Sequence, residues 1–180
     1  MDKKLSAAEP FGLRDAVPAD AAALAEFGAR TFREAFEADN TTEDMNGYLQ
    51  SAFSESKQRR EIEDPAIDTL ILANPERWLG FAQLRAGQLP EGVPEPGSIE
   101  LWRFYVDRPW HGRGVAKALM DGAKQRGRRR GATSMWLGVW ERNARAQAFY
   151  RKHGFVPVGR KVFVVGSDPQ TDDVLLCDLR

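Results

Sequence analysis

An apolar stretch that runs through two closely spaced glycines into a helix-forming sequence is the feature that most constrains this chain. Residues 101–106 are typical of a buried strand, Gly112 and Gly114 follow, and a helical pattern begins at Arg113. A strand, a tight glycine turn and a helix N-terminus aim backbone N–H groups and the positive end of a helix dipole at one point. The segment therefore predicts a site for the phosphate or pyrophosphate group of an anionic cofactor.

Two common phosphate loops do not fit this segment. The dinucleotide-binding fingerprint needs glycine or alanine three residues after the second glycine, where Lys117 stands. Its acidic ribose partner, expected about 20 residues further on, is missing from the uncharged residues 135–139. A P-loop needs Gly-Lys followed by Ser or Thr, and that tripeptide does not occur in the sequence.

The composition is that of one globular domain. The 180 residues are 42% hydrophobic, with five tryptophans and ten phenylalanines, and a chain of this length buries about 70% of its unfolded surface. No apolar run approaches the roughly 20 residues of a membrane span. Residues 1–10 lack the apolar core of a signal peptide. We therefore expect a flexible N-terminal tail over residues 1–10 and a single domain over residues 11–180.

Cysteine and histidine usage indicates a protein of the reducing cytoplasm that binds no metal. Cys177 is the only cysteine, which excludes an internal disulfide and a cysteine metal site. The two histidines, His111 and His153, are too few for a histidine-rich site.

Charge is distributed unevenly along the chain, although the net charge is zero. Residues 1–107 carry 11 Lys and Arg against 20 Asp and Glu, a balance of −9. Residues 108–180 carry 15 against 6, a balance of +9. The basic half contains the predicted anion loop, and the acidic half could attract a cation. The alternative is that the acidic half is only a solvated surface.

Hydrophobic periodicity predicts a mixed sheet covered by helices on both faces, an α/β or α+β single domain. Helices are expected over residues 19–38, 43–60, 113–129 and 143–153, with Gly154 as a left-handed C-cap. Residues 86–97, rich in glycine and proline, are expected to form a loop. Strands are expected over residues 11–16, 67–73, 78–85, 98–106, 134–140, 156–165 and 174–179, with a turn over 166–171.

The run of arginines over residues 126–131 could be a nucleic-acid patch. The stronger interpretation is the solvated C-terminal end of a helix, where cations are favourable. No zinc-finger spacing or interleaved aromatic platform accompanies it, so we expect no nucleic-acid partner.

Three residues outside the loop could carry chemistry. Asn143 and Tyr150 lie two turns apart on one face of a predicted helix, and Glu100 lies in the strand that leads to the loop. Each has a plainer interpretation: Asn143 as an N-cap, Tyr150 as a core aromatic, Glu100 as a solvent-facing strand residue. Spacing alone favours the N-cap for Asn143.

Together these motifs resemble the GCN5-related N-acetyltransferases, the GNAT superfamily, which use acetyl-CoA. The resemblance rests on residues 111–116 together with Asn143, Phe149-Tyr150 and Gly154-Phe155, and it covers essentially the whole chain. The superfamily's Gln/Arg-x-x-Gly-x-Gly/Ala signature matches with one departure, a histidine at position 111. The resemblance implies a single-domain fold with a mixed, mostly antiparallel seven-stranded sheet and about four helices.

The resemblance also implies roles for individual residues. The strand over residues 100–106 would carry a bulge and splay away from residues 135–140, and the pantetheine arm would lie in that gap. Asn143 and Lys152 would help to hold the cofactor, Tyr150 would protonate the departing thiolate, and Glu100 would take the proton of the amine. The pyrophosphate would bind His111, Gly112, Arg113, Gly114, Val115 and Ala116, and the pantetheine arm would pair with Phe104, Tyr105 and Val106.

Residues 31–49, 136–143 and 166–172 further resemble bacterial polyamine acetyltransferases of the Pai type. This resemblance implies a small-molecule amine acceptor such as spermidine or spermine. An alkyl ammonium with a pKa near 10.4 is neutral in only about one molecule in 10³ at pH 7, so a base is needed. Recognition of such a cation is expected from the carboxylates of the first two helices: Glu34, Glu37, Asp39, Glu43 and Asp44.

Several alternatives stay open at this point. The acceptor could instead be a protein N-terminus, a lysine, an amino acid or an aminoglycoside, because fold-level similarity does not separate these. The chain could also be a non-catalytic acyl-CoA-binding module. For an enzyme we expect direct transfer in a ternary complex, because Cys177 has no nucleophile-like context. The oligomeric state is open, with a homodimer as one option.

Overall fold

A single seven-stranded sheet organises the chain, of which the computed structural model describes residues 11–94 and 96–180. The expected tail over residues 1–10 lies outside the described residues. The strand order is β1-β2-β3-β4-β5-β7-β6, and every neighbouring pair is antiparallel except β4 and β5. The strands are β1 Gly12–Asp15, β2 Ile67–Ala73, β3 Trp78–Arg85, β4 Ser98–Val106, β5 Ser134–Trp140, β6 Val156–Val165 and β7 Asp168–Asp178.

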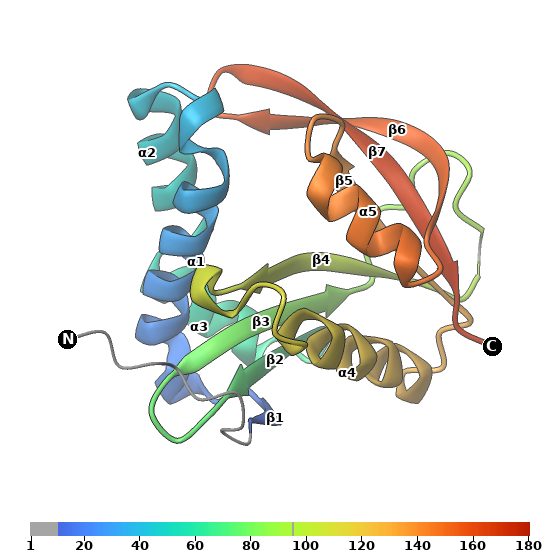
Figure 1. Cartoon of the computed structure of the whole chain (residues 1–180), viewed down its shortest axis with the longest axis horizontal. Helices are drawn as coiled ribbons and strands as arrows, with labels where there is room; N and C mark the ends of the chain where they lie inside the picture. The colour runs from blue at the N-terminus through green and yellow to red at the C-terminus, as the bar shows by residue number, and fades with distance from the viewer. Residues whose placement is uncertain (1–10, 95) are drawn as a thin grey trace.

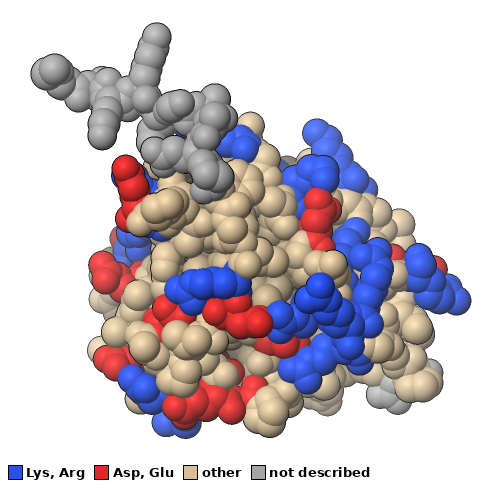
Figure 2. Space-filling view, turned by 90° about the horizontal axis from the view of Figure 1, so that it is seen from below, with Lys and Arg blue, Asp and Glu red and all other residues tan. Residues whose placement is uncertain are grey.

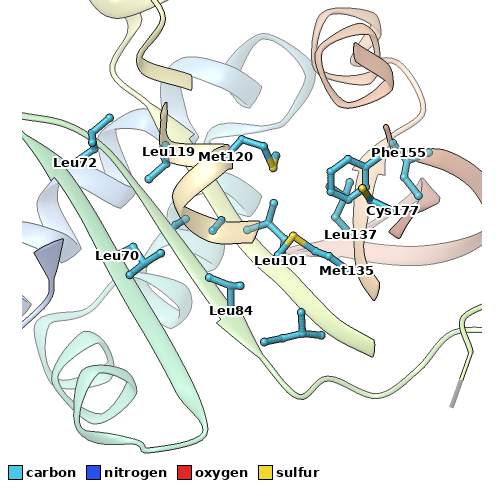
Figure 3. Close-up of a cluster of buried hydrophobic side chains, with 14 of the residues drawn as sticks. Leu70, Leu72, Leu84, Leu101, Leu119, Met120, Met135, Leu137, Phe155 and Cys177 are labelled. Atoms are coloured by element: carbon cyan, nitrogen blue, oxygen red, sulfur yellow. The ribbon is translucent and has the colours of Figure 1, made fainter. Parts of the chain in front are cut away.

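Helices cover both faces of the sheet, as the periodicity predicts (Figure 1). One layer packs around an aromatic cluster that includes Phe27, Phe32 and Phe81. The other packs on a cluster in which Leu119 and Met120 lie among strand residues such as Leu101 (Figure 3). The first layer contains α1 Ala21–Phe36, α2 Thr42–Ala52 and α3 Glu55–Glu63, and the second contains α4 Val115–Arg129 and α5 Ala144–Lys152. Among the described residues, none of the helices has both the length and the apolar character needed to cross a membrane.

The single helix expected over residues 43–60 is wrong, since α2 and α3 are separate. Phe53 leaves the helical conformation with φ −128° and ψ 31°, and Ser54 caps α3 by accepting a hydrogen bond from the Lys57 N–H at 3.4 Å. The break lets the Phe53 ring enter the aromatic cluster. Gly28 in α1 leaves room for it, because a Cβ there would lie 2.4 Å from that ring. The described part of the chain therefore has five α-helices where about four were expected.

The turn expected over residues 166–171 is present but shorter than predicted. β6 and β7 join through Gly166 and Ser167 alone, and Gly166 has a φ of +60°. Asp44 of α2 holds this turn, since its Oδ1 accepts hydrogen bonds from the Ser167 N–H at 2.6 Å and the Ser167 hydroxyl at 3.0 Å. Pairing with β6 satisfies the backbone of residues that look turn-like in sequence, so Asp172 lies inside a strand.

The bulge and the splayed strands implied by the resemblance are confirmed. Gln83 of β3 pairs with Arg103, whereas Leu84 pairs with Leu101, so Trp102 is the extra residue of a β-bulge. β4 pairs with β5 at only three positions, ending at Glu100 opposite Trp136. Beyond this point the facing edges of β4 and β5 do not pair with each other, and the sheet is open between them.

Candidate active site

A cleft of about 790 Å³ occupies the opening between β4 and β5. Its wall combines the end of β4, the glycine loop, and residues of α1, α5 and the β6–β7 hairpin. Of the predicted site residues, the cleft is lined by Glu34, Asp39, Glu100, Phe104, Tyr105, Val106, His111, Gly112, Ala116, Asn143 and Tyr150.

The glycine loop has the backbone geometry of an anion site. Gly112 and Gly114 have φ values of +75° and +83°, a left-handed conformation that other residues adopt only with strain. Gly114 is the N-cap of α4 and makes no side-chain capping bond. The N–H groups of the first helical turn have no partner within a helix, so these donors and the helix dipole suit a phosphate. Arg113, Gly114 and Val115 shape the loop without lining the cleft.

His111, the departure from the family signature, ties the loop to its neighbours. Its Nε2 lies 2.9 Å from the Val106 carbonyl oxygen and its Nδ1 lies 2.7 Å from Nη1 of Arg145. Because a guanidinium can only donate, Nδ1 accepts and Nε2–H donates, which assigns a neutral imidazole. The histidine thereby joins the end of β4 to α5.

Cationic side chains line the cleft near the glycine loop, where Arg145 contacts His111. Arg108, Arg142 and Arg145 all line it. Arg142 also lies over the Trp140 ring, 5.8 Å from its centroid. A polyphosphate ligand would meet this positive rim before it reached the helix N-terminus, so the electrostatics agree with the loop geometry.

Tyr150 lies where an acid could act on a group in the cleft. It projects from α5 against Phe104 and Phe155, with ring centroids 6.2 and 5.7 Å away. Burial raises the pKa of its hydroxyl. The tyrosine therefore stays protonated throughout the physiological range and can only donate its proton there.

Asn143 and Lys152 were both predicted to hold the cofactor, but only Asn143 lines the cleft. The Asn143 Oδ1 accepts a hydrogen bond from the Ala146 N–H at 3.1 Å, so the N-cap favoured by spacing alone is confirmed. Its amide nitrogen takes no part in the cap, and the residue also lines the cleft. Lys152 is exposed on α5 and does not line the cleft.

Glu100 is a buried carboxylate held by two cations, which corrects the plainer interpretation of a solvent-facing residue. It is 3% exposed, and its Oε2 lies 2.6 Å from Nε of Arg85. Its Oε1 lies 3.7 Å from Nζ of Lys161. The Arg85 guanidinium also lies 3.6 Å from the centroid of the Trp102 ring, which links Glu100 to the bulge.

Asp172 is a cleft carboxylate that sequence reasoning missed. It is 7% exposed and lines the cleft from β7. Burial raises its pKa to about 6, an effect that nearby Lys161 opposes and Asp173 reinforces. The signal in the sequence was weak, because Asp172 fell between the predicted turn over residues 166–171 and the predicted strand over 174–179. Only strand pairing with Trp140 brings Asp172 to the cleft.

The predicted substrate carboxylates divide into two groups. Glu34 and Asp39 line the cleft from the α1 side. Glu37 and Glu43 are exposed and do not line it. Asp44 is occupied with the Ser167 turn, and those hydrogen bonds lower its pKa. Of this set, Glu34 and Asp39 are therefore the residues placed to meet a ligand in the cleft.

The arginine run over residues 126–131 is engaged in part by contacts within the chain. Arg126 and Arg130 both form ion pairs with Asp68 of β2, each at 2.7 Å, and Arg128 donates to the Leu179 carbonyl at 2.7 Å. Figure 2 shows most Lys and Arg toward the right of this face of the molecule, with Asp and Glu mainly at its centre and left. The run thus fastens the end of α4 to the sheet.

Cys177 lies in a structural environment. It is buried, and its thiol faces the carbonyls of His153 at 3.6 Å and Asp178 at 3.3 Å. Across residues 11–94 and 96–180, no three His, Cys, Asp or Glu side chains gather as they would around a metal ion.

Known proteins resemble this chain in sequence. Residues 30–155 match the sequence profile of the Acetyltransferase (GNAT) family. The chain is 33% identical over 145 residues to an uncharacterized N-acetyltransferase from the pepI 3' region of Lactobacillus delbrueckii subsp. lactis, covering 81% of this chain and 84% of the relative. It is 31% identical over 160 residues to an uncharacterized N-acetyltransferase of Mycobacterium tuberculosis H37Rv, covering 89% and 98%.

The fold also matches a solved structure. The PaiA N-acetyltransferase from Thermoplasma acidophilum in complex with coenzyme A superposes with a TM-score of 0.76 over 94% of this chain and 99% of that chain. The two are 18% identical, so this likeness shows the fold alone. The profile match and the two relatives go further: the chain belongs to the GNAT family and is an N-acetyltransferase.

Proposed function

We propose that this chain transfers the acetyl group of acetyl-CoA to a primary amine of a polyamine such as spermidine or spermine, by direct transfer in a ternary complex. One observation carries the proposal. The cleft between β4 and β5 has an anion-binding loop with arginines at one end and carboxylates elsewhere in its wall. This arrangement suits an anionic acyl donor and a cationic acceptor in one cavity.

The residues present fit acetyl-CoA, whose thioester supplies an activated acetyl group. The left-handed glycines and the uncapped start of α4 would hold its pyrophosphate. The unpaired edge of β4 at Phe104, Tyr105 and Val106 offers backbone groups to the pantetheine arm. One of these N–H groups would polarise the thioester carbonyl, as in an oxyanion hole.

Tyr150 is proposed as the acid. Its raised pKa keeps the proton on Oη until a thiolate forms beside it. A thiolate is a weak base, with a pKa near 8.5 for its acid. The thiolate is a weaker base than the phenolate of Tyr150, so Tyr150 stabilises it by a charge-assisted hydrogen bond, and the Tyr150 proton passes to sulfur only as the proton released by the amine replaces it.

Glu100 is proposed as the carboxylate that takes the amine proton. Arg85 and Lys161 hold both of its oxygens in place. General-base help of this kind contributes roughly 10²–10⁴-fold. The buried Cys177 thiol offers no route to an acyl-enzyme, which favours direct transfer.

A polyamine acceptor is supported by the sequence resemblance together with Glu34 and Asp39 on the cleft wall. A small-molecule acceptor also suits the cleft volume of about 790 Å³. The cytoplasm remains the proposed location, on the ground of the single thiol.

The test is release of CoA thiol from acetyl-CoA with spermidine, comparing the wild type with Tyr150→Phe. We expect Tyr150→Phe to lower kcat by roughly 10²–10⁴-fold with CoA affinity unchanged, because only the proton donor is lost. Phe155→Leu, a neighbouring change without a hydroxyl, is the control for disturbed packing. Equal kcat in Tyr150→Phe and the wild type would refute the assignment of the acid.

A further inference from the structure

The cleft already contains one alkyl ammonium group, that of Lys161 in β6. Its Nζ lies 3.7 Å from Oε1 of Glu100 and 5.0 Å from the centroid of the Trp136 ring. Lys161 also pairs across the β6–β7 hairpin with Asp172. Carboxylates and an indole face are the groups that stabilise an ammonium ion. The surroundings of Lys161 therefore show which ligand chemistry this part of the cleft favours.

Asp172 stands apart from the other carboxylates of the cleft. Glu100 has Arg85 and Lys161 as partners. Among the described residues, none gives the Asp172 carboxylate a hydrogen bond or an ion pair closer than 4.0 Å, although it is only 7% exposed. A buried carboxylate without a partner is costly unless a ligand supplies one. Asp172 is therefore suited to form an ion pair with a cationic ligand.

Gly138 of β5 lets the side chains of Asp172 and Lys161 approach the β5 backbone closely. A Cβ at this position would clash with Cε of Lys161 and would lie 2.9 Å from both Oδ2 of Asp172 and Nζ of Lys161. The missing side chain therefore leaves room for the carboxylate and the ammonium group beside one point of the strand. Gly138, Lys161 and Asp172 all line the cleft.

Depth within the cleft separates Asp172 from the rim carboxylates. Glu34 and Asp39 are exposed, whereas Asp172 is buried beside the opening between the strands. A linear polyamine that enters with one end would bring its reacting nitrogen to the deep carboxylate. Its trailing ammonium groups would remain near the rim.

We propose that Asp172 binds the reacting ammonium group of the acceptor and so sets the preference for alkyl amines, a proposal that rests on the proposed function. Asp172 is here a substrate-binding residue, and Glu100 keeps the proposed role of proton acceptor. The two roles separate in kinetics: loss of Asp172 raises the KM for the amine, whereas loss of Glu100 lowers kcat.

The pH dependence of amine binding follows from the titratable groups near Asp172. These are Lys161 from β6, Tyr48 from α2, Tyr105 from β4 and Asp173 on its own strand. Burial raises the pKa of both tyrosines, so they stay neutral, and Asp173 is held by Arg160 at 3.3 Å. The free Asp172 carboxylate has a pKa of about 6. It is therefore protonated below that pH, and amine affinity rises as the pH increases through about 6.

The experiment is calorimetric binding of spermidine and of n-butylamine to the CoA-saturated protein between pH 5 and pH 8. This assay measures amine binding and needs no acetyl transfer. If the protein transfers no acetyl group, the proposed function is refuted, and the role of Asp172 in amine binding is still tested. The variants are Asp172→Asn, with Asp173→Asn as the matched control on the next residue of β7. Lys161→Gln tests whether Asp172 acts only through the lysine.

We expect Asp172→Asn to weaken binding of both amines at pH 8 by roughly tenfold or more and to abolish the rise near pH 6. Asp173→Asn and Lys161→Gln should both keep the affinity at pH 8. The rise should move to lower pH in Asp173→Asn and to higher pH in Lys161→Gln, because Asp173 reinforces and Lys161 opposes the raised pKa of Asp172. Unchanged affinity in Asp172→Asn would overturn the proposal. An equal loss in Lys161→Gln would also overturn it, because Asp172 would then serve only to position the lysine.

Discussion

At the scale of single residues, the left-handed backbone conformation of Gly112 and Gly114 shapes the loop at the start of α4. Gly114 has a φ of +83°, and a Cβ there would meet no heavy atom within 4 Å. The cost of a side chain is therefore conformational, not steric. Gly131, with a φ of +78° and the same open surroundings, offers a matched position at the other end of α4.

Gly114→Ala and Gly131→Ala should each lower the free energy of unfolding by about 1–2 kcal/mol, because both place an L-residue in the left-handed region. Only Gly114→Ala should also weaken CoA binding, since it disturbs the N–H groups at the start of α4. Urea unfolding and calorimetric titration with CoA measure the two effects. A similar loss of CoA affinity in Gly131→Ala would show that the loop has no special role.

Sequence patterns predicted the residues whose role depends on local geometry. Gly112 and Gly114 were predicted to form an anion loop because a strand, a glycine turn and a helix are consecutive in the chain, and their left-handed conformation suits that prediction. Asn143 was likewise predicted to be an N-cap from its place before a helix. Asp172 was missed because its position depends on pairing between β5 and β7, which are far apart in sequence. Lys152 was predicted to hold the cofactor only from the family resemblance. It is exposed and does not line the cleft, because it lies on the face of α5 that points to solvent.

At the scale of elements, a buried network fastens α3 to the bulged part of β4. The Arg103 guanidinium pairs with Glu61 of α3 at 2.5 Å, and it donates to Oε1 of Gln83 at 2.6 Å. It also lies 4.0 Å from the centroid of the Trp102 ring. Glu61 and Arg103 are both nearly inaccessible to solvent. The network holds the bulge and hence the open edge of β4 that lines the cleft.

Glu61→Gln should destabilise the protein by about 3–5 kcal/mol, because it leaves the buried Arg103 charge without its anion. Glu55→Gln on the same helix is the control. Glu55 is exposed and pairs with Arg59 only at 3.5 Å, so its loss should change stability by less than about 0.5 kcal/mol. Urea unfolding followed by circular dichroism compares them. Equal midpoints for the two variants would contradict the role given to the network.

Elements were predicted better than their boundaries. All seven strands were expected, yet the single helix over residues 43–60 is two helices, because the chain leaves the helical conformation at Phe53, whose ring lies in the aromatic cluster. The apolar residues of this segment stop at Phe53, and residues 54–60 are all polar or charged, so hydrophobic periodicity could not show where one helix ends and the next begins. Two residues mark the break in the sequence: Ser54 can cap a new helix, and Gly28 leaves space for a ring. Their connection becomes clear only when the Phe53 ring is seen packed against Gly28.

At the scale of the whole molecule, the two halves of the chain bring opposite charges to one cleft. Arg108, Arg142 and Arg145 come from the basic half, and Glu34 and Asp39 from the acidic half. The division holds for these five residues and not for the whole cavity, because Arg85 of the acidic half and Asp172 of the basic half line the cleft as well. Such a field steers ions of both signs and weakens as salt is added.

Charge reversal tests the rim of this cavity. Glu34→Lys with Asp39→Lys should raise the KM for spermidine and flatten its dependence on salt, because the attraction of a polycation is lost. Glu43→Lys, an exposed change outside the cleft wall, should alter neither. The measurement is the KM for spermidine at low and high ionic strength in the three proteins. If Glu43→Lys has as large an effect, the acidic half acts only through net charge.

The most direct test of the acceptor is a competition among amines. The purified protein is given acetyl-CoA with an equimolar mixture of spermidine, spermine, a lysine peptide, an amino acid and an aminoglycoside, and the products are identified by mass spectrometry. We predict that acetylated spermidine or spermine dominates. Acetylation of the peptide or the aminoglycoside with the polyamines untouched would contradict the polyamine assignment, and CoA binding without any acetylated product would contradict the proposed reaction.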